Sequence, residues 1–224
     1  MKAGNRAYRS PRDLPATLPV FPLSAALLLP RAELPLNIFE PRYLAMVDAA
    51  LCGERLIGMV QPNPNAPDLP TGPALCAVGC AGRITAFAET GDDRYMITLT
   101  GIARFRIVEE TAAATAFRRC RIDADPFAVD FAACSADETV DRNSVLRTFR
   151  AYLRANDLDA DWESVGRASN ETLVNTLAMI APFGPAEKQA LLEAPDLRTR
   201  AETLVAITEM TLAGNAGADR RTLQ

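Results

Sequence analysis

The chain has 224 residues, of which 49% are hydrophobic and 23% are charged, and its formal net charge is −4. These values predict a folded protein with a sizeable core, and the negative charge disfavours general binding of polyanions. The sequence contains no histidine, which excludes Ser-His-Asp and Cys-His catalysis, histidine-ligated zinc and a histidine pH switch.

Five cysteines lie at scattered positions, and their odd number does not fit a disulfide framework. We interpret them as reduced thiols, several of them buried. Cys76 and Cys80 lie four residues apart, but no second close pair completes a zinc site, so we expect no metal and no cofactor. Prolines interrupt the apolar stretch near the N-terminus, and no run of about 18 apolar residues occurs. We therefore expect a cytoplasmic protein without a membrane span.

The first half of the chain reads mainly as strands. Residues 1–14 are polar and without period, and we expect them to be a flexible N-terminal arm. Short apolar runs punctuated by proline then predict strands or strand ends over residues 18–23, 27–30 and 34–39. Apolar residues at helical spacing predict a helix over Pro41–Leu51, and a strand follows over Leu56–Val60.

A loop and further strands complete this half. Residues 61–73 contain five prolines and predict a surface loop. Strands with alternating polar and apolar residues follow over residues 75–89, 94–101, 103–110 and 116–124. Gly79 and Gly82 lie inside the first of these strands, where glycine indicates a bulge or the tight bend that a barrel needs.

The second half reads as helices, because apolar stripes recur over residues 145–153 and 173–180. Ser169 and Asn170 are candidate caps before the second stripe. Pro185 can begin a further helix, and Asp196 and Gly214 mark the beginning and the end of the last one. Trp162 lies between two of the helices, and we expect it to fill the core.

Strands first and helices second favour an α+β fold. We expect a β domain over residues 15–127, an α-helical subdomain over residues 136–214 and a frayed tail over residues 215–224.

Several runs of residues together resemble one family. LPVFPL, LLLP, LPLNIFEPRYLAMVDAAL and LIGMVQP, all within residues 18–62, resemble the opening of the Lon N-terminal (substrate-binding) domain. VGCAGRI, RYMITLTGIARFRIVEE and FRRCRI match its remaining strands in order, and residues 180–204 resemble the helical segment that follows them in Lon. The resemblance covers about residues 17–212, and it is strongest to the short stand-alone proteins of the family.

The resemblance implies a PUA-like, partly open β-barrel followed by a C-terminal helical bundle. It also implies a module that binds proteins or unfolded peptides and works with an ATP-dependent protease system. The sequence departs from the family at Arg31, where we expect glycine after the proline of LLLP. It has no phosphate-cradling Gly-rich loop and no recognisable Ser-Lys peptidase unit, its only lysines being Lys2 and Lys188, so we expect no enzymatic activity.

Four candidate partner-binding residues lie in the IFEPRY run: Phe39, Glu40, Arg42 and Tyr43. They could present a charged pair and aromatic anchors to a partner, in a groove between barrel and helices with loop 61–73 as a flexible rim. The alternative, which we favour, is structural. Glu40 would then lie at a helix N-terminus, Arg42 would pair with a strand carboxylate, and both aromatic side chains would pack in the core.

Arg104 and Arg106 are the other two candidates for partner binding. RNA binding is the alternative function, because five arginines on neighbouring strands form a basic patch if they share a sheet face: Arg104, Arg106, Arg118, Arg119 and Arg121. Four acidic residues at the strand ends favour a solvated face of mixed charge instead: Glu109, Glu110, Asp123 and Asp125. No Gly-rich or aromatic RNA-stacking motif accompanies the arginines.

Overall fold

The computed structural model describes residues 1–69, 71–112, 114–132 and 140–221, and the chain divides into two compact units. The β unit joins Met1–Ala133 to Pro182–Leu192, and the helical unit joins Cys134–Ala181 to Glu193–Gln224. Helix α5 (Pro185–Glu193) therefore belongs almost entirely with the strands. This differs from the expected division, which placed all the helices after residue 136 in one subdomain.

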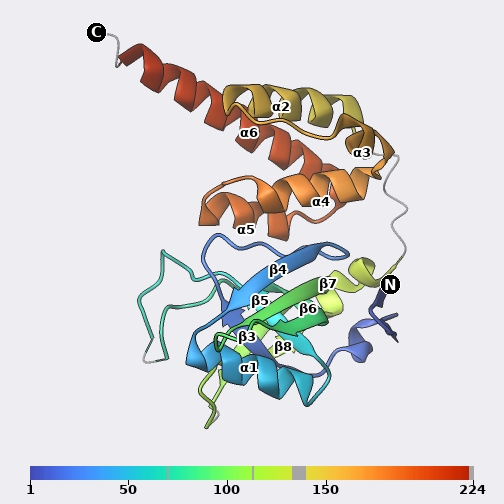
Figure 1. Ribbon diagram of the computed structural model, residues 1–224, viewed down its shortest axis with the longest axis vertical. Helices are drawn as coiled ribbons and strands as arrows, with labels where there is room; N and C mark the ends of the chain where they lie inside the picture. The colour runs from blue at the N-terminus through green and yellow to red at the C-terminus, as the bar shows by residue number, and fades with distance from the viewer. Residues whose placement is uncertain (70, 113, 133–139, 222–224) are drawn as a thin grey trace. The chain divides into compact units, whose positions relative to one another are not determined.

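Six strands form the main sheet of the β unit (Figure 1): β3 (Thr17–Pro22), β4 (Glu33–Ile38), β5 (Leu56–Val60), β6 (Val78–Glu89), β7 (Tyr95–Thr111) and β8 (Arg119–Asp123). Their order is β4-β7-β6-β5-β3-β8, and a further pairing of β7 with β8 joins five of them into a ring. Only β3 and β5 run parallel. Among the described strands β4 pairs with β7 alone, so it lies at an edge.

β7 is one continuous strand, although we expected two strands over residues 94–101 and 103–110. Gly101, where we expected the first of them to end, lies inside β7 and packs closely against the segment before β4. A Cβ at this position would come within 2.1 Å of the Leu29 carbonyl oxygen. The glycine therefore permits a close approach of two backbones and does not interrupt the strand. Residues 27–30 themselves are buried but form no strand.

Phe105 fills the core of the β unit, and glycines on two neighbouring strands leave room for its ring. A Cβ at Gly58 or Gly79 would lie 2.8 or 2.7 Å from the ring, which is closer than real contacts allow. The pairing of β6 with β7 shifts register between Ala81 and Gly82, which confirms the bulge that glycine predicted in this strand.

The N-terminal residues are folded, and the expected flexible arm over residues 1–14 was wrong. They form a small hairpin, β1 (Lys2–Ala3) with β2 (Arg6–Ala7), and a short 3-10 helix, η1 (Pro11–Asp13). Tyr8 is fully buried, and its hydroxyl accepts a 3.3 Å hydrogen bond from Arg83 Nη1. This partner lies 75 residues away in the sequence, so local composition gives no sign of it.

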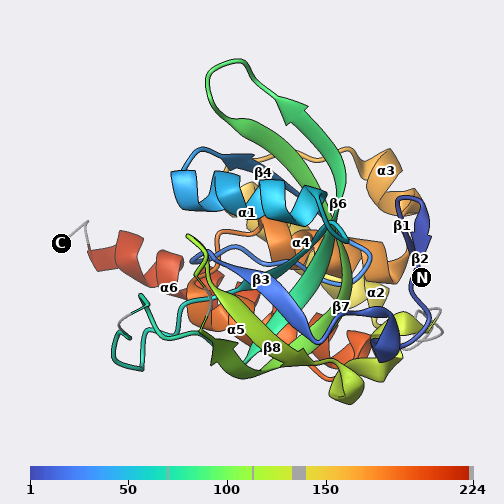
Figure 2. The same ribbon diagram turned by 90° about the horizontal axis from the view of Figure 1, so that it is seen from below.

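Helix α1 (Pro41–Leu51) forms where the sequence predicted it. Pro41 occupies its first turn, and Met46 and Val47 face the interior of the β unit without solvent exposure. Figure 2 shows α1 lying across the strands, with the β6–β7 hairpin extending past it.

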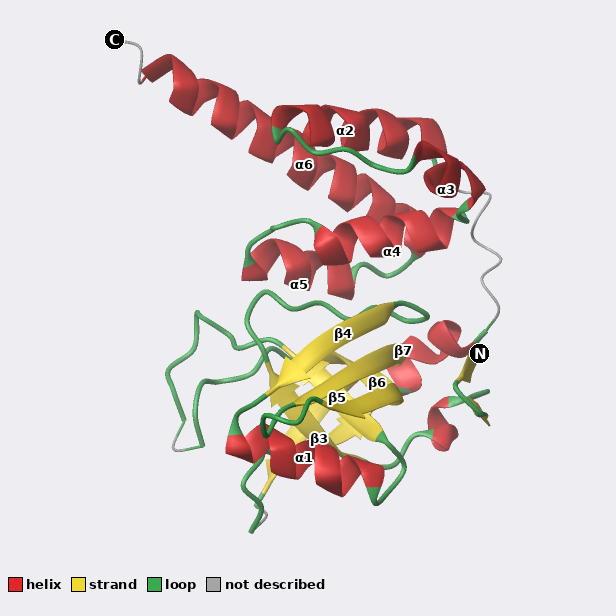
Figure 3. Ribbon diagram, viewed as in Figure 1, coloured by secondary structure: helices red, strands yellow, loops and turns green. Residues whose placement is uncertain are grey.

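The helical unit contains α2 (Arg142–Ala155), α3 (Trp162–Arg167), α4 (Asn170–Ile180) and α6 (Leu197–Arg221), shown in red in Figure 3. α6 packs against both α2 and α4. The Ser169 hydroxyl accepts from the Thr172 N–H at 3.1 Å, as its predicted role as N-cap requires. α6 continues through Gly214, so the expected helix end there was wrong: a helix interior tolerates glycine at a cost of about 1 kcal/mol. No described helix is long and apolar enough to cross a membrane.

The backbone at Arg31, where we expected glycine, has a conformation that glycine adopts most easily. Its φ of 66° lies in the left-handed region, where a residue with a side chain is strained. Its Nη2 donates to the Asp130 carbonyl at 2.8 Å and also to the Ala132 carbonyl, so the strained residue holds a distant segment in place.

We expect Arg31→Ala to destabilise the protein, because it keeps the strained backbone and loses both hydrogen bonds. Arg31→Gly loses the same bonds but relaxes the backbone, so it should be more stable than Arg31→Ala by about 1 kcal/mol. Urea denaturation of the three proteins measures this order. Equal stability of the two variants would show that the left-handed backbone carries no strain.

Candidate partner-binding surface

The IFEPRY segment turns the chain from β4 into α1 and places its four candidate residues differently. Phe39 is 60% exposed, whereas Tyr43 is buried with its ring centroid 4.2 Å from that of Phe21. Burial raises the pKa of Tyr43. Glu40 Oε2 lies 2.8 Å from Arg42 Nη2, so Arg42 pairs with its neighbour rather than with a strand carboxylate. Phe39, Glu40 and Arg42 thus reach solvent, and the buried side chain of Tyr43 holds the segment in place.

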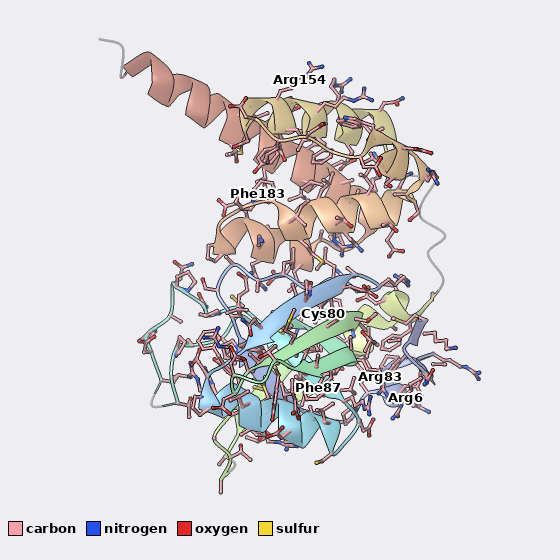
Figure 4. The ribbon with its side chains drawn as sticks, viewed as in Figure 1. Arg6, Cys80, Arg83, Phe87, Arg154 and Phe183 are labelled. Carbon is pink, nitrogen blue, oxygen red and sulfur yellow. The ribbon has the colours of Figure 1, made fainter. Side chains whose placement is uncertain are left out.

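Two further aromatic residues, which sequence reasoning missed, lie on neighbouring strands at the same end of the sheet as Phe39. Tyr95 is paired in register with Ile38, and the Phe87 and Tyr95 ring centroids lie 5.0 Å apart. Phe87 is 39% exposed, and the Arg94 guanidinium lies 5.9 Å from the centroid of the Phe39 ring. We call Phe39, Phe87, Arg94 and Tyr95 the sheet-end surface; Figure 4 labels Phe87. The turn signal at residues 91–93 indicates the hairpin that brings Phe87 and Tyr95 together.

The β6–β7 hairpin carries Phe87, Arg94 and Tyr95 of the sheet-end surface, and hydrogen bonds hold it at two places. Thr90 N–H donates to the Arg94 carbonyl at 3.1 Å, which closes the turn. The Tyr95 hydroxyl forms a hydrogen bond with Asp48 of α1, and this bond is the main cause that raises the pKa of Tyr95. The aromatic side chains are therefore presented on a fixed backbone rather than on a loose loop.

Arg104 is buried, which contradicts its assignment to partner binding. It is 2% exposed, and its side chain forms a bidentate pair with Asp130, at 2.8 Å from Nη2 to Oδ1 and 2.9 Å from Nε to Oδ2. The Arg104 N–H also donates to Asp130 Oδ2 at 2.9 Å, and Nη1 donates to the Leu192 carbonyl at 3.3 Å. Asp130 belongs to the short helix η2 (Asp125–Phe131), so the pair joins β7, η2 and α5.

Two of the other four candidate arginines form ion pairs with carboxylates. Arg118 makes two hydrogen bonds to Glu110, at 2.9 and 2.6 Å, and Arg121 Nε lies 2.9 Å from Glu109 Oε1. Arg106 is exposed, but its register partner on β8 is Asp123. The strands thus carry a face of mixed charge, which does not favour the RNA-binding alternative.

The Pro-rich loop lines a cleft of about 810 Å³ within the β unit. Leu69 and Thr71 form one side, and the end of β7 with the segment after it forms the other, through residues 110–112 and 114–118. Arg118 Nη1 donates to the Pro73 carbonyl at 2.6 Å, and Thr71 Oγ1 donates to Glu110 at 3.3 Å. The described part of the loop that we expected to be a flexible rim is therefore bound to β7 and to Arg118, the residue before β8.

Groups that could do chemistry are sparse in the described part of the chain. It contains no cluster of three or more Cys, Asp or Glu residues that could hold a metal ion. Burial raises the pKa of Cys120 to about 11, so this thiol stays protonated at neutral pH. Trp162 does not fill the core as expected: it begins α3 and is partly exposed, with its ring 6.0 Å from that of Phe149.

Comparison with known proteins identifies the family of this fold. The model of the ATP-dependent protease La (LON) substrate-binding domain matches residues 17–209. Lon protease 2 of Myxococcus xanthus is 26% identical over 199 residues, which are 84% of this chain and 23% of that protein. Lon protease 2 of Sorangium cellulosum is 27% identical over 92% of this chain and 26% of its own length. The chain thus spans about a quarter of the length of these relatives.

Solved structures show the same fold. A Lon N-terminal domain protein from Xanthomonas campestris aligns with a TM-score of 0.59 and 22% identity, covering 85% of this chain and 97% of that one. The N-terminal domain of the Mycobacterium avium complex Lon protease aligns with a TM-score of 0.63 and 18% identity, covering 86% and 98%.

Arg104→Ala should destabilise the protein by about 3–5 kcal/mol, because it leaves the Asp130 carboxylate buried without its partner. The double variant Arg104→Met with Asp130→Leu should recover part of that loss, since no buried charge remains. Urea denaturation measures both effects. A loss below about 1 kcal/mol for Arg104→Ala, typical of exposed pairs, would contradict the burial of this pair.

The Glu110–Arg118 pair predicts a pH-dependent contribution to stability. The hydrogen bond from Arg118 holds the pKa of Glu110 below its ordinary value of 4.5. A lowered folded-state pKa stabilises the fold above the ordinary value, and this contribution is lost as the pH falls through the folded-state value. Glu110→Gln should therefore be less stable than the natural protein at neutral pH, with the difference shrinking in acid. Denaturation across a pH series checks this, and a difference independent of pH would refute it.

Proposed function

Because the chain belongs to the family of ATP-dependent protease La (LON) substrate-binding domains, we propose that it is a non-catalytic module that binds proteins or unfolded peptides. Its partners would be substrate proteins of an ATP-dependent protease system. The absence of histidine and of a recognisable nucleophile unit from the sequence supports a binding role without chemistry of its own. We also propose that the ring of strands is a PUA-like, partly open barrel, which the pairing of β7 with β8 supports.

The sheet-end surface is the observation that carries the proposal. Aromatic side chains on a rigid backbone provide a large contact area at a low cost in conformational entropy, and they are enriched where proteins bind one another. Phe39 is 60% exposed at the end of a strand whose last residue, Ile38, is buried. A side chain of this size, exposed at the same end of the sheet as Phe87 and Tyr95, offers an apolar contact for segments that unfolded proteins expose.

A binding measurement with a permanently unfolded protein tests the proposal. We expect fluorescently labelled, reduced and carboxymethylated α-lactalbumin to bind the natural chain. The double variant Phe39→Ser with Phe87→Ser should weaken this binding about tenfold to a hundredfold, since aromatic anchors dominate such interfaces.

The matched control is Val108→Ser with Val129→Ser, because both valines are exposed apolar residues of the β unit outside the sheet-end surface. This control should bind as the natural chain does. Binding no stronger than to an unrelated globular protein, or equal losses in the two double variants, would overturn the proposal.

A further inference from the structure

Helix α2 carries an unusual charge pattern. It contains four arginines and no acidic residue, in a chain whose net charge is −4. Its buried residues Val145, Thr148 and Tyr152 share one face, which packs in the helical unit. Arg147, Arg150 and Arg154 are three and four residues apart, so they lie together on the opposite face, and all three are exposed. Figure 4 labels Arg154, whose side chain points away from α6.

These three arginines, which we call the arginine stripe, form no ion pair with any described residue. Arg147 Nη2 donates to the Ser144 hydroxyl at 3.3 Å, and the Arg150 guanidinium lies 4.6 Å from the centroid of the Trp162 ring. The fourth arginine of the helix, Arg142, differs because it is fixed by the Asn170 side chain at 2.8 Å. The stripe thus offers three guanidinium groups that form no ion pair with a described residue, and that of Arg150 lies beside a partly exposed tryptophan.

Two acidic residues close to Trp162 are engaged within their own segment. Asp161 caps α3 and accepts from the Ser164 hydroxyl at 2.5 Å, and Glu163 pairs with Arg167 one turn later. Elsewhere on the surface several exposed arginines have acidic partners, as Arg198 has Glu202 at 2.8 Å. The stripe differs from these pairs because three exposed arginines that form no ion pair with a described residue lie together on one helix face.

We propose that the arginine stripe binds an acidic peptide segment of a partner protein. The three arginines span about 10 Å along the helix, which fits a few carboxylates of one short segment. Arginine suits this task because its planar fork matches a carboxylate with two hydrogen bonds. Trp162 adds an apolar contact beside the charges, and tryptophan and arginine are the residues that contribute most at protein interfaces.

An acidic peptide fits this stripe better than a polyanion or a membrane does. The sequence pI of about 5.0 contrasts with the strongly basic domains that bind nucleic acids. Basic clusters that recognise anionic lipids generally hold about 4–8 charges, and this stripe has three. The inference rests on the proposed function, since it names one class of segment that the module recognises, but it uses a different surface of the molecule.

The probe is a short, fluorescently labelled oligoglutamate peptide, with oligoglutamine, single-stranded DNA and phosphatidylserine vesicles as the other arms. We expect the full chain to bind oligoglutamate in a salt-sensitive manner and to bind oligoglutamine not at all. The triple variant Arg147→Gln, Arg150→Gln, Arg154→Gln should weaken oligoglutamate binding about tenfold.

The control changes net charge by the same amount at three exposed arginines that are already paired with glutamates: Arg121→Gln, Arg167→Gln and Arg198→Gln. It should bind oligoglutamate as the natural chain does. Equal weakening in both triple variants, no binding of oligoglutamate, or preference for DNA or vesicles would overturn the proposal. If oligoglutamate fails while unfolded α-lactalbumin still binds through Phe39 and Phe87, only this inference falls. If neither ligand binds, the proposed function falls with it.

Discussion

The β unit depends on one buried ion pair, between Arg104 and Asp130. Moving two charges out of water costs several kcal/mol for each ion, and this cost is offset only where geometry and extra hydrogen bonds are good. Here the guanidinium and carboxylate meet in two hydrogen bonds, a backbone N–H satisfies the same carboxylate, and the Leu192 carbonyl accepts from Arg104. These hydrogen bonds hold η2 and α5, which lie far apart in the sequence, against the middle of β7. The same strand begins at Tyr95, so the pair also fixes the strand that carries the sheet-end surface.

Arginine serves two separate purposes in this molecule. In the β unit it cross-links: Arg31, Arg83 and Arg118 each donate to a main-chain carbonyl of a distant segment. A guanidinium suits this purpose because it has five donors in a rigid plane and always carries its charge. The three arginines of the stripe on α2 donate to no main-chain carbonyl of a distant described segment, and they are exposed. The same residue type thus cross-links the β unit and stays at the surface in the stripe.

The sequence predicted elements whose residues repeat at a regular spacing. α1 and α4 form where apolar residues recur at helical spacing, and the bulge in β6 forms at its glycine. The errors arose where a distant segment decides. Alternation along β7 placed Arg104 on a solvated face, but η2 and α5 contact that face, and a period of two contains no information about them. Tyr8 is buried for a similar reason. The sequence indicated Phe39 of the sheet-end surface but not Phe87 or Tyr95. These two residues meet across a turn whose geometry cannot be read from the sequence alone.

The order in which the chain is synthesised has a consequence for the β unit. Its last segment, Pro182–Leu192, follows some fifty residues of the other unit, and Gln189 donates to the Val78 carbonyl from there. At a translation rate of about 5–20 residues per second, the ribosome needs on the order of 2–10 s to reach this segment. During that interval the strands exist without the Leu192 carbonyl that Arg104 uses. Chaperones that shield nascent chains would therefore meet an incomplete β unit, because its last segment can pack against the strands only after most of the polypeptide has emerged.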